Sequence, residues 1–213
     1  MTTVLLIRHG HSVTNLKGIF TGQTDVALSP IGEKQAVLTA QFVFDNYTVN
    51  KIYSSDLSRA VATALPLSRL THIEIIKDRN LREIYGGAWE NKNVDDIMRE
   101  YPEQYALWKN NIGLCRPPRG ESVEELQKRA GEEVYKIASE NNGKTVVIFS
   151  HACFIRTIQC LFQKVPLSGM HNIPWVPNAS VTEIVFGERG ARIAKLALSD
   201  HLKSIETVLN PKL

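Results

Sequence analysis

The segment VLLIRHGHSVTN, residues 4–15, leads an apolar run directly into arginine and histidine side chains. Val4 to Ile7 has the continuous apolar character of a short strand covered on both faces, and Arg8, His9 and His11 follow it. Arginine donates paired, charge-assisted hydrogen bonds to phosphate oxygens, and a neutral imidazole is a competent nucleophile toward phosphorus. Arg8 and His9 therefore indicate phosphoryl chemistry, provided that the fold brings further groups to the same place.

Two other predicted strands end in the same kinds of residue. KIYSS, residues 51–55, runs into a segment that contains Arg59, and KTVVIFS, residues 144–150, runs into His151 and Ala152 at the start of a predicted helix. In α/β sheets, ligands bind beyond the carboxyl ends of the strands. Parallel strands would thus place two guanidiniums, two imidazoles and a helix N-terminus, with its free N–H groups, at one edge. The set predicts a phosphate-binding pocket.

The predicted pocket also needs an acid to protonate the leaving alkoxide. Glu83 follows the third predicted strand, and partial desolvation would raise its pKa enough to hold a proton near neutral pH. The flanking arginines would disfavour the imidazolium form of His9 and keep that ring neutral. Gly10 would let the backbone approach the ring or the phosphate closely.

The elements that must position these residues alternate along the chain, which is typical of an α/β fold with a mainly parallel sheet. The patterns predict strands over 4–7, 51–55, 73–78 and 144–150, helices over 28–46, 55–67, 120–142 and 151–162, and a β-hairpin over 180–198. The irregular stretch 81–120 is predicted to be partly helical and to lie over one edge of the sheet. We expect a three-layer helix–sheet–helix architecture in a single domain over 1–213, with a small cap insertion at about 81–120.

Local signals set some of the helix boundaries. Ser29 is the predicted N-cap of the first helix, and Ser122 with Glu125 predicts a capping box at the third. The second helix is expected to start near Ser55 or Asp56 and to end or kink at Pro66.

Composition is that of an ordinary globular protein: of 213 residues, 43% are hydrophobic and 22% are charged. The formal net charge of +3 comes without a basic run or a long apolar run, so neither nucleic-acid nor membrane binding is expected. Three widely spaced cysteines without a CxxC pair favour buried thiols in a reducing compartment. No export signal is visible. We therefore expect a cytoplasmic monomer or homodimer whose partner is a small phosphorylated metabolite.

Six blocks of the chain, in this order, resemble the motifs of the histidine phosphatase superfamily, which includes cofactor-dependent phosphoglycerate mutases and small-molecule phosphatases. They are RHG at 8–10, TGQTDVALSPIGEKQA at 21–36, IYSSDLSRAVATA at 52–64, LREIYGGAWE at 81–90, PRGESVEEL at 118–126 and VVIFSHACFIR at 146–156.

The resemblance implies a phosphatase that needs no metal and no cofactor. His9 would be the phosphorylated nucleophile, and Arg8, Arg59 and His151 would bind the phosphoryl group. Glu83 would donate the proton and later activate water against the phosphohistidine. The candidate substrate-binding residues are Asn15, Thr21, Gly22, Gln23, Tyr85 and Ala152.

The chain departs from the family's commonest pattern at several positions. His11 stands where acidic or amide residues are frequent, and Gln23 replaces a tryptophan common in the mutases. Mutases carry a longer cap with a lysine and an arginine pair for the substrate carboxylate, which Lys92, Arg116 and Arg119 do not match. A short cap also makes it harder to keep water from a phosphohistidine. A phosphatase is favoured, with a phosphoglycerate mutase as the alternative.

Two further classes stay open at the level of sequence. His9 and His11 have the H-x-H spacing of some metal sites, and His151 would complete a zinc triad in a metal-dependent hydrolase. Such an enzyme would lose activity in a chelator, whereas the phosphohistidine mechanism would not. A binding protein with a degenerate site would turn over no phosphomonoester at all.

Overall fold

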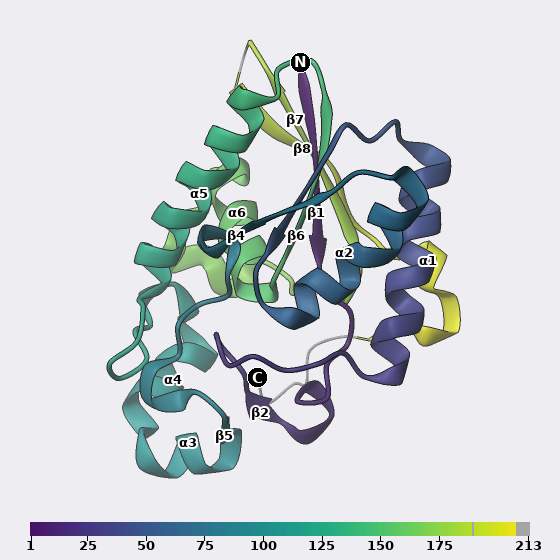
Figure 1. Cartoon of the computed structure of the whole chain (residues 1–213). Helices are drawn as coiled ribbons and strands as arrows, with labels where there is room; N and C mark the ends of the chain where they lie inside the picture. Colours follow the sequence, from purple (N-terminus) through teal and green to yellow (C-terminus); the bar gives the residue numbers. More distant parts are fainter. Residues whose placement is uncertain (189, 208–213) are drawn as a thin grey trace.

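The fold is built on a six-stranded sheet in the computed structural model, which describes residues 1–188 and 190–207 (Figure 1). The strand order is β4-β3-β6-β1-β7-β8. The strands span Thr2–Arg8 (β1), Lys51–Ser55 (β3), Ile75–Asp78 (β4), Thr145–Ser150 (β6), Val181–Gly187 (β7) and Gly190–Leu198 (β8). Pairing is parallel from β4 through β3 and β6 to β1, and β7 runs antiparallel to both β1 and β8. The mostly parallel sheet and the late hairpin are confirmed.

Four long helices cover the two faces of the sheet (Figure 1). Helices α1 and α2 share one face, and α5 and α6 share the other; they span Pro30–Asn46, Ser58–Thr71, Val123–Glu140 and Ala152–Gln163, respectively. Strand β1 shows why both faces must be covered. Val4 and Leu6 pack with α5 and α6, whereas Leu5 and Ile7 pack with α1 and α2, and all four side chains are fully buried. The predicted helix–sheet–helix arrangement is confirmed.

The helix boundaries follow the predicted caps at two places. The Ser29 hydroxyl accepts a hydrogen bond from the backbone N–H of Gly32 at 3.2 Å and begins α1. Ser122 and Glu125 form the reciprocal capping box that begins α5. These are local interactions within one turn, which explains why the sequence alone predicts them.

Helix α2 differs from its prediction at both ends. It begins at Ser58 rather than near residue 55, because Ser55 still belongs to β3. It also continues through Pro66 to Thr71. Leu67, directly after the proline, is fully buried in the core between α1, α2 and the sheet. That packing outweighs the local cost of a proline inside a helix.

Residues 81–120 form an irregular excursion that contains α3 (Val94–Glu100), α4 (Pro102–Asn110) and the short strand β5 (Lys92–Asn93). β5 pairs with β2, Ile19–Phe20, in a two-stranded ribbon. The ribbon joins the excursion to the loop that follows β1, and Figure 1 shows both beyond the carboxyl end of β1. The shorter 3₁₀ turns are Asn15–Lys17, Arg79–Leu81, Gly87–Trp89, Ile112–Leu114, Leu167–Asn172 and Asp200–Ile205. None of the helices in the described residues is both long and apolar enough to span a bilayer.

Candidate active site

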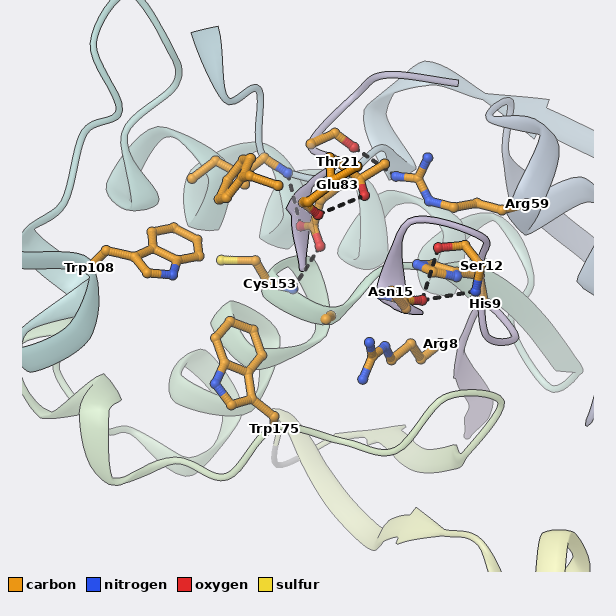
Figure 2. A pocket seen from close by; sticks show the side chains of 15 residues that line it. Arg8, His9, Ser12, Asn15, Thr21, Arg59, Glu83, Trp108, Cys153 and Trp175 are labelled. Carbon is orange, nitrogen blue, oxygen red and sulfur yellow. Dashed lines mark hydrogen bonds between the residues drawn. The ribbon is translucent and has the colours of Figure 1, made fainter. Parts of the chain in front are cut away.

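A cavity lies at the carboxyl end of the sheet, where the loop after β1 meets the excursion (Figure 2). Its volume is about 60 Å³. One side is polar, with Arg8, His9 and Arg59 in its wall. The other side carries the indole rings of Trp108 and Trp175, so the cavity has a cationic end and an aromatic end (Figure 2).

The sheet register explains how the cationic end is assembled. Arg8 is the register partner of Ser150 across the parallel β1–β6 pair, and the backbone N–H of His9 donates to the Ser150 carbonyl at 2.9 Å. His9 and His151 therefore leave neighbouring strands at the same level. Their ring centroids are 5.1 Å apart.

The His9 ring is buried and has one of its nitrogens fixed. Its Nδ1 lies 2.7 Å from the carbonyl oxygen of Gly10. A carbonyl only accepts, so Nδ1 carries the proton and Nε2 keeps a free lone pair. Burial, and then the charges of Arg59 and Arg8, lower the pKa of His9 well below its ordinary value. The ring is therefore neutral near pH 7, with the arginines contributing as expected and burial contributing more.

Arg8 and Arg59 are both about 1% exposed and held by backbone carbonyls. Arg8 Nη1 donates to the Val176 carbonyl at 2.6 Å, and the two terminal nitrogens of Arg59 donate to the carbonyls of Gly22 and Thr24 at 2.7 and 2.9 Å. The Nε of each arginine is buried and has no partner among the described residues. Burial lowers the pKa of both groups to about 10, so both stay charged at neutral pH.

His151 is fully buried, and its Nε2 lies 2.8 Å from the Ser55 hydroxyl oxygen. Its other nitrogen, Nδ1, has no partner within the described residues. Burial and then the charge of Arg59 lower the pKa of His151 well below its ordinary value. It is not itself in the cavity wall, although it lies against the His9 ring.

The Glu83 carboxylate is the acidic group in the wall of the cavity. It accepts backbone hydrogen bonds from Ile84 at 2.9 Å, Cys153 at 3.0 Å and Phe154 at 3.2 Å. Burial raises the pKa of Glu83, and these N–H donors together with Arg59 oppose the rise. The net direction is upward, as the sequence predicts. Two backbone N–H groups in the first turn of α6 therefore bind the Glu83 carboxylate. The sequence instead predicts that such groups bind a phosphate.

Four of the candidate substrate-binding residues line the cavity: Asn15, Thr21, Gly22 and Ala152. The other two do not. Gln23 Nε2 instead donates to the Glu83 carbonyl at 3.0 Å, and Tyr85 is 46% exposed to solvent outside the cavity. Gln23 thus supports the segment that carries the acid, and the Tyr85 side chain turns outward.

His11 and Gly10 contact the start of α1 and do not line the cavity. His11 Nδ1 lies 2.9 Å from the Ser29 hydroxyl at the start of α1, and His11 is absent from the cavity wall. A Cβ on Gly10 would come 2.6 Å from the Gly32 carbonyl oxygen, so the Gly10 backbone lies close to α1 as well as to the His9 ring, which its carbonyl oxygen meets at 2.7 Å. Across the described parts of the chain, no three His, Cys, Asp or Glu residues are grouped to hold a metal ion.

The sequence did not single out several residues of the aromatic end. Trp108 comes from α4, Trp175 from the loop before β7, and Cys153 from the first turn of α6. The only signal in the sequence is the group of large aromatic residues in the irregular stretch 81–120, which includes Trp108 but not Trp175. Their convergence depends on contacts between distant segments, which periodicity does not encode.

The fold and this cavity define a class of phosphoryl-transfer enzyme, and comparison with known proteins agrees. Residues 4–199 match the histidine phosphatase superfamily, branch 1, so the chain belongs to this superfamily. It is an enzyme of the phosphatase type, in a family that acts through a phosphohistidine.

Individual relatives match over most of their length. The chain is 32% identical over 202 residues to phosphoserine phosphatase 1 of Hydrogenobacter thermophilus, covering 95% of each protein. It is 28% identical over 207 residues to a metal-independent phosphoserine phosphatase of Arabidopsis thaliana, covering 96% of this chain and 85% of that protein. A probable phosphoglycerate mutase of Photorhabdus laumondii is 32% identical over 162 residues, covering 74% and 75%. The solved structure of YhfR from Bacillus stearothermophilus has a TM-score of 0.91 at 30% identity, covering 95% and 100%.

Proposed function

We propose that this chain, as a single domain, hydrolyses the phosphomonoester of a small metabolite by transferring the phosphoryl group to Nε2 of His9. The observation that carries the proposal is the hydrogen bond from His9 Nδ1 to the Gly10 carbonyl at 2.7 Å. It presents a neutral ring with the Nε2 lone pair free, at the cationic end of the cavity. That is the state in which an imidazole attacks phosphorus.

Arg8 and Arg59 bind the phosphoryl group in this proposal. Both remain charged, both line the cavity, and each has a buried Nε without a protein partner. Phosphoryl oxygens supply acceptors for such donors, and charge-assisted pairs are stronger than neutral ones. His151, the fourth expected phosphoryl-binding residue, is buried against the His9 ring, and its Nδ1 has no partner among the described residues.

Glu83 moves the proton in both half-reactions. In the first, the P–N bond to His9 forms, the ester P–O bond breaks with its electron pair on oxygen, and protonated Glu83 donates its proton to that oxygen. In the second, the Glu83 carboxylate takes a proton from water as the water oxygen attacks phosphorus and the P–N bond breaks. The raised pKa of Glu83 supports the first role.

The substrate is small, and phosphoserine is the first candidate because relatives across nearly the whole chain are named for it. Two cations of the excursion, Lys92 and Arg116, are paired with carboxylates away from the cavity. Lys92 pairs with Glu100 at 2.5 Å, Arg116 pairs with Glu125, and neither cation lines the cavity. This supports hydrolysis rather than mutase activity. Mutase activity stays the alternative, because one relative is named as a probable phosphoglycerate mutase.

The deciding experiment is a panel of small phosphomonoesters, including phosphoserine and 3-phosphoglycerate, assayed with a chelator present and followed by a mutase assay. We expect phosphate release that the chelator does not change. Loss of activity in the chelator would indicate a metal-dependent hydrolase. Transfer of phosphate between the positions of phosphoglycerate would indicate a mutase, and the absence of turnover would indicate a binding protein. Three cysteines, all free and buried, support a cytoplasmic location, and sedimentation will distinguish a monomer from a homodimer.

A further inference from the structure

Glu90 lies at the end of the 3₁₀ turn Gly87–Trp89 and carries a carboxylate with four hydrogen bonds. Its Oε1 accepts from the backbone N–H groups of Gln23 and Gly86, both at 2.8 Å. Its Oε2 accepts from the Thr24 backbone N–H at 2.7 Å and from the Thr24 hydroxyl at 2.5 Å. A carboxylate has about four lone-pair sites, so this one is fully used. It ties the loop after β2 to the excursion.

The same loop holds Arg59 from its other side. The carbonyls of Gly22 and Thr24 accept the two terminal nitrogens of Arg59 at 2.7 and 2.9 Å. Thr24 therefore donates its N–H to Glu90 and offers its carbonyl to Arg59. A continuous chain of short hydrogen bonds runs from the Glu90 carboxylate through one loop to a guanidinium in the cavity wall.

The backbone at Gly22 is shaped around this arrangement. Its φ is +51°, and a Cβ there would overlap Oε1 of Glu90. A glycine is needed both for the left-handed backbone and for the space that the carboxylate fills. Glu90 also adds negative charge near a buried cation, and its charge raises the pKa of Arg59 against the larger effect of burial.

We propose that Glu90 is a positioning residue for the phosphoryl site: it fixes loop 22–24, and through the two loop carbonyls it sets the direction of the Arg59 guanidinium. The inference rests on the proposed function only for the role of Arg59 in phosphoryl binding. A glutamine at this position keeps one acceptor oxygen but turns an NH₂ group toward backbone N–H donors. At least one of the four hydrogen bonds is then lost, because an NH₂ group cannot accept from a backbone N–H, and the loop shifts.

The test is a double-mutant cycle of wild type, Glu90→Gln, Arg59→Ala and the double variant, measured as kcat/KM and as inorganic phosphate affinity by calorimetry. A misplacement of about 1 Å costs on the order of 100-fold in rate. We expect Glu90→Gln to lower kcat/KM by about 10- to 100-fold when Arg59 is present and by less than about twofold when it is absent. Glu100→Gln, in the exposed pair with Lys92 on the same excursion, is the matched control and stays near wild type.

A general structural role would lower kcat/KM by the same factor in both backgrounds, and that result overturns the proposal. If Glu90→Gln does not fold, Glu90→Asp replaces it in the same cycle, since it keeps the charge and both oxygens but shortens the side chain. Phosphate binding needs no turnover. Coupled phosphate affinities without hydrolysis would overturn the proposed function alone, whereas hydrolysis without coupling would overturn this inference alone.

Discussion

The carboxylate of Glu83 accepts a hydrogen bond from the backbone N–H of Cys153 at 3.0 Å, although the two residues are 70 positions apart in the chain. The bond fixes the acid on the first turn of α6, immediately after His151. A helix N-terminus favours a carboxylate over a carboxylic acid, yet burial is the larger effect and the pKa of Glu83 is raised. The site thus holds a carboxyl group with a raised pKa and a fixed direction.

Glu83→Gln separates proton donation from the rest of catalysis. Alkyl phosphomonoesters need a proton on a poor leaving group, so we expect kcat/KM to fall by about 100-fold or more for them. Nitrophenyl phosphate carries a good leaving group and should lose less than about tenfold. Parallel assays of the two substrate types check this. An equal loss for both would remove Glu83 from the role of leaving-group acid.

The two histidines of RHGH should behave differently when labelled phosphate is trapped on the enzyme. His9→Ala removes the Nε2 nucleophile, so we expect neither turnover nor acid-labile, base-stable phosphoenzyme after rapid quenching. His11→Ala removes a contact to the Ser29 cap outside the cavity and should retain the phosphoenzyme. Phosphate trapped on any residue other than His9 would contradict the mechanism.

The sequence predicts most of the cationic end of the cavity because these residues directly follow strands that short apolar runs reveal. Each strand is a short apolar run, so the residue that follows it is known, and parallel pairing then brings Arg8, His9 and His151 together. Ser29 is recognisable as a cap for the same reason, since its partner is three residues away.

The positions that the sequence could not predict depend on contacts between distant segments. The Glu83 carboxylate occupies N–H groups at the start of α6, which the sequence predicts to be free, and the Gln23 side chain donates to the Glu83 carbonyl. The ring centroids of Trp108 and Trp175 lie 6.4 Å apart because α4 and the loop before β7 pack together. No periodicity or cap encodes these pairs, because each depends on the packing of the whole excursion.

Gly32 gives a stability prediction that opposes helix propensity. Glycine to alanine inside a helix ordinarily stabilises by about 1 kcal/mol. Here a Cβ would overlap the carbonyl oxygen of His11, which is backbone and cannot turn aside. We expect Gly32→Ala to lower the free energy of unfolding by about 1–3 kcal/mol, as overpacked sites do. Gly131→Ala in α5 meets only the end of the Leu161 side chain and is the control, expected to be neutral or to stabilise by up to about 1 kcal/mol. Urea denaturation measures the free energy of unfolding of both variants. A Gly32→Ala variant more stable than wild type would refute the predicted overlap with the His11 carbonyl.

Acid should destabilise the fold through the two imidazoles His9 and His151, which lie against each other at the cationic end. The pKa values of His9 and His151 are lowered well below 6.5, chiefly by burial. In the unfolded chain both take up a proton as the pH falls through about 6.5, so the unfolded state binds more protons and the free energy of unfolding falls. At pH 5.5 each neutral histidine accounts for about 1.4 kcal/mol of lost stability relative to pH 7.5.

Glu83 acts in the opposite sense, because its raised pKa gives stability that is present in acid and lost as the pH rises through the folded pKa. Comparing variants removes this term. We expect His151→Asn and His9→Asn each to reduce the loss of unfolding free energy between pH 7.5 and 5.5 by about 1.4 kcal/mol. Urea titrations at the two pH values measure it. An unchanged loss in both variants would mean that the two rings take up protons without unfolding, contrary to their burial beside two arginines.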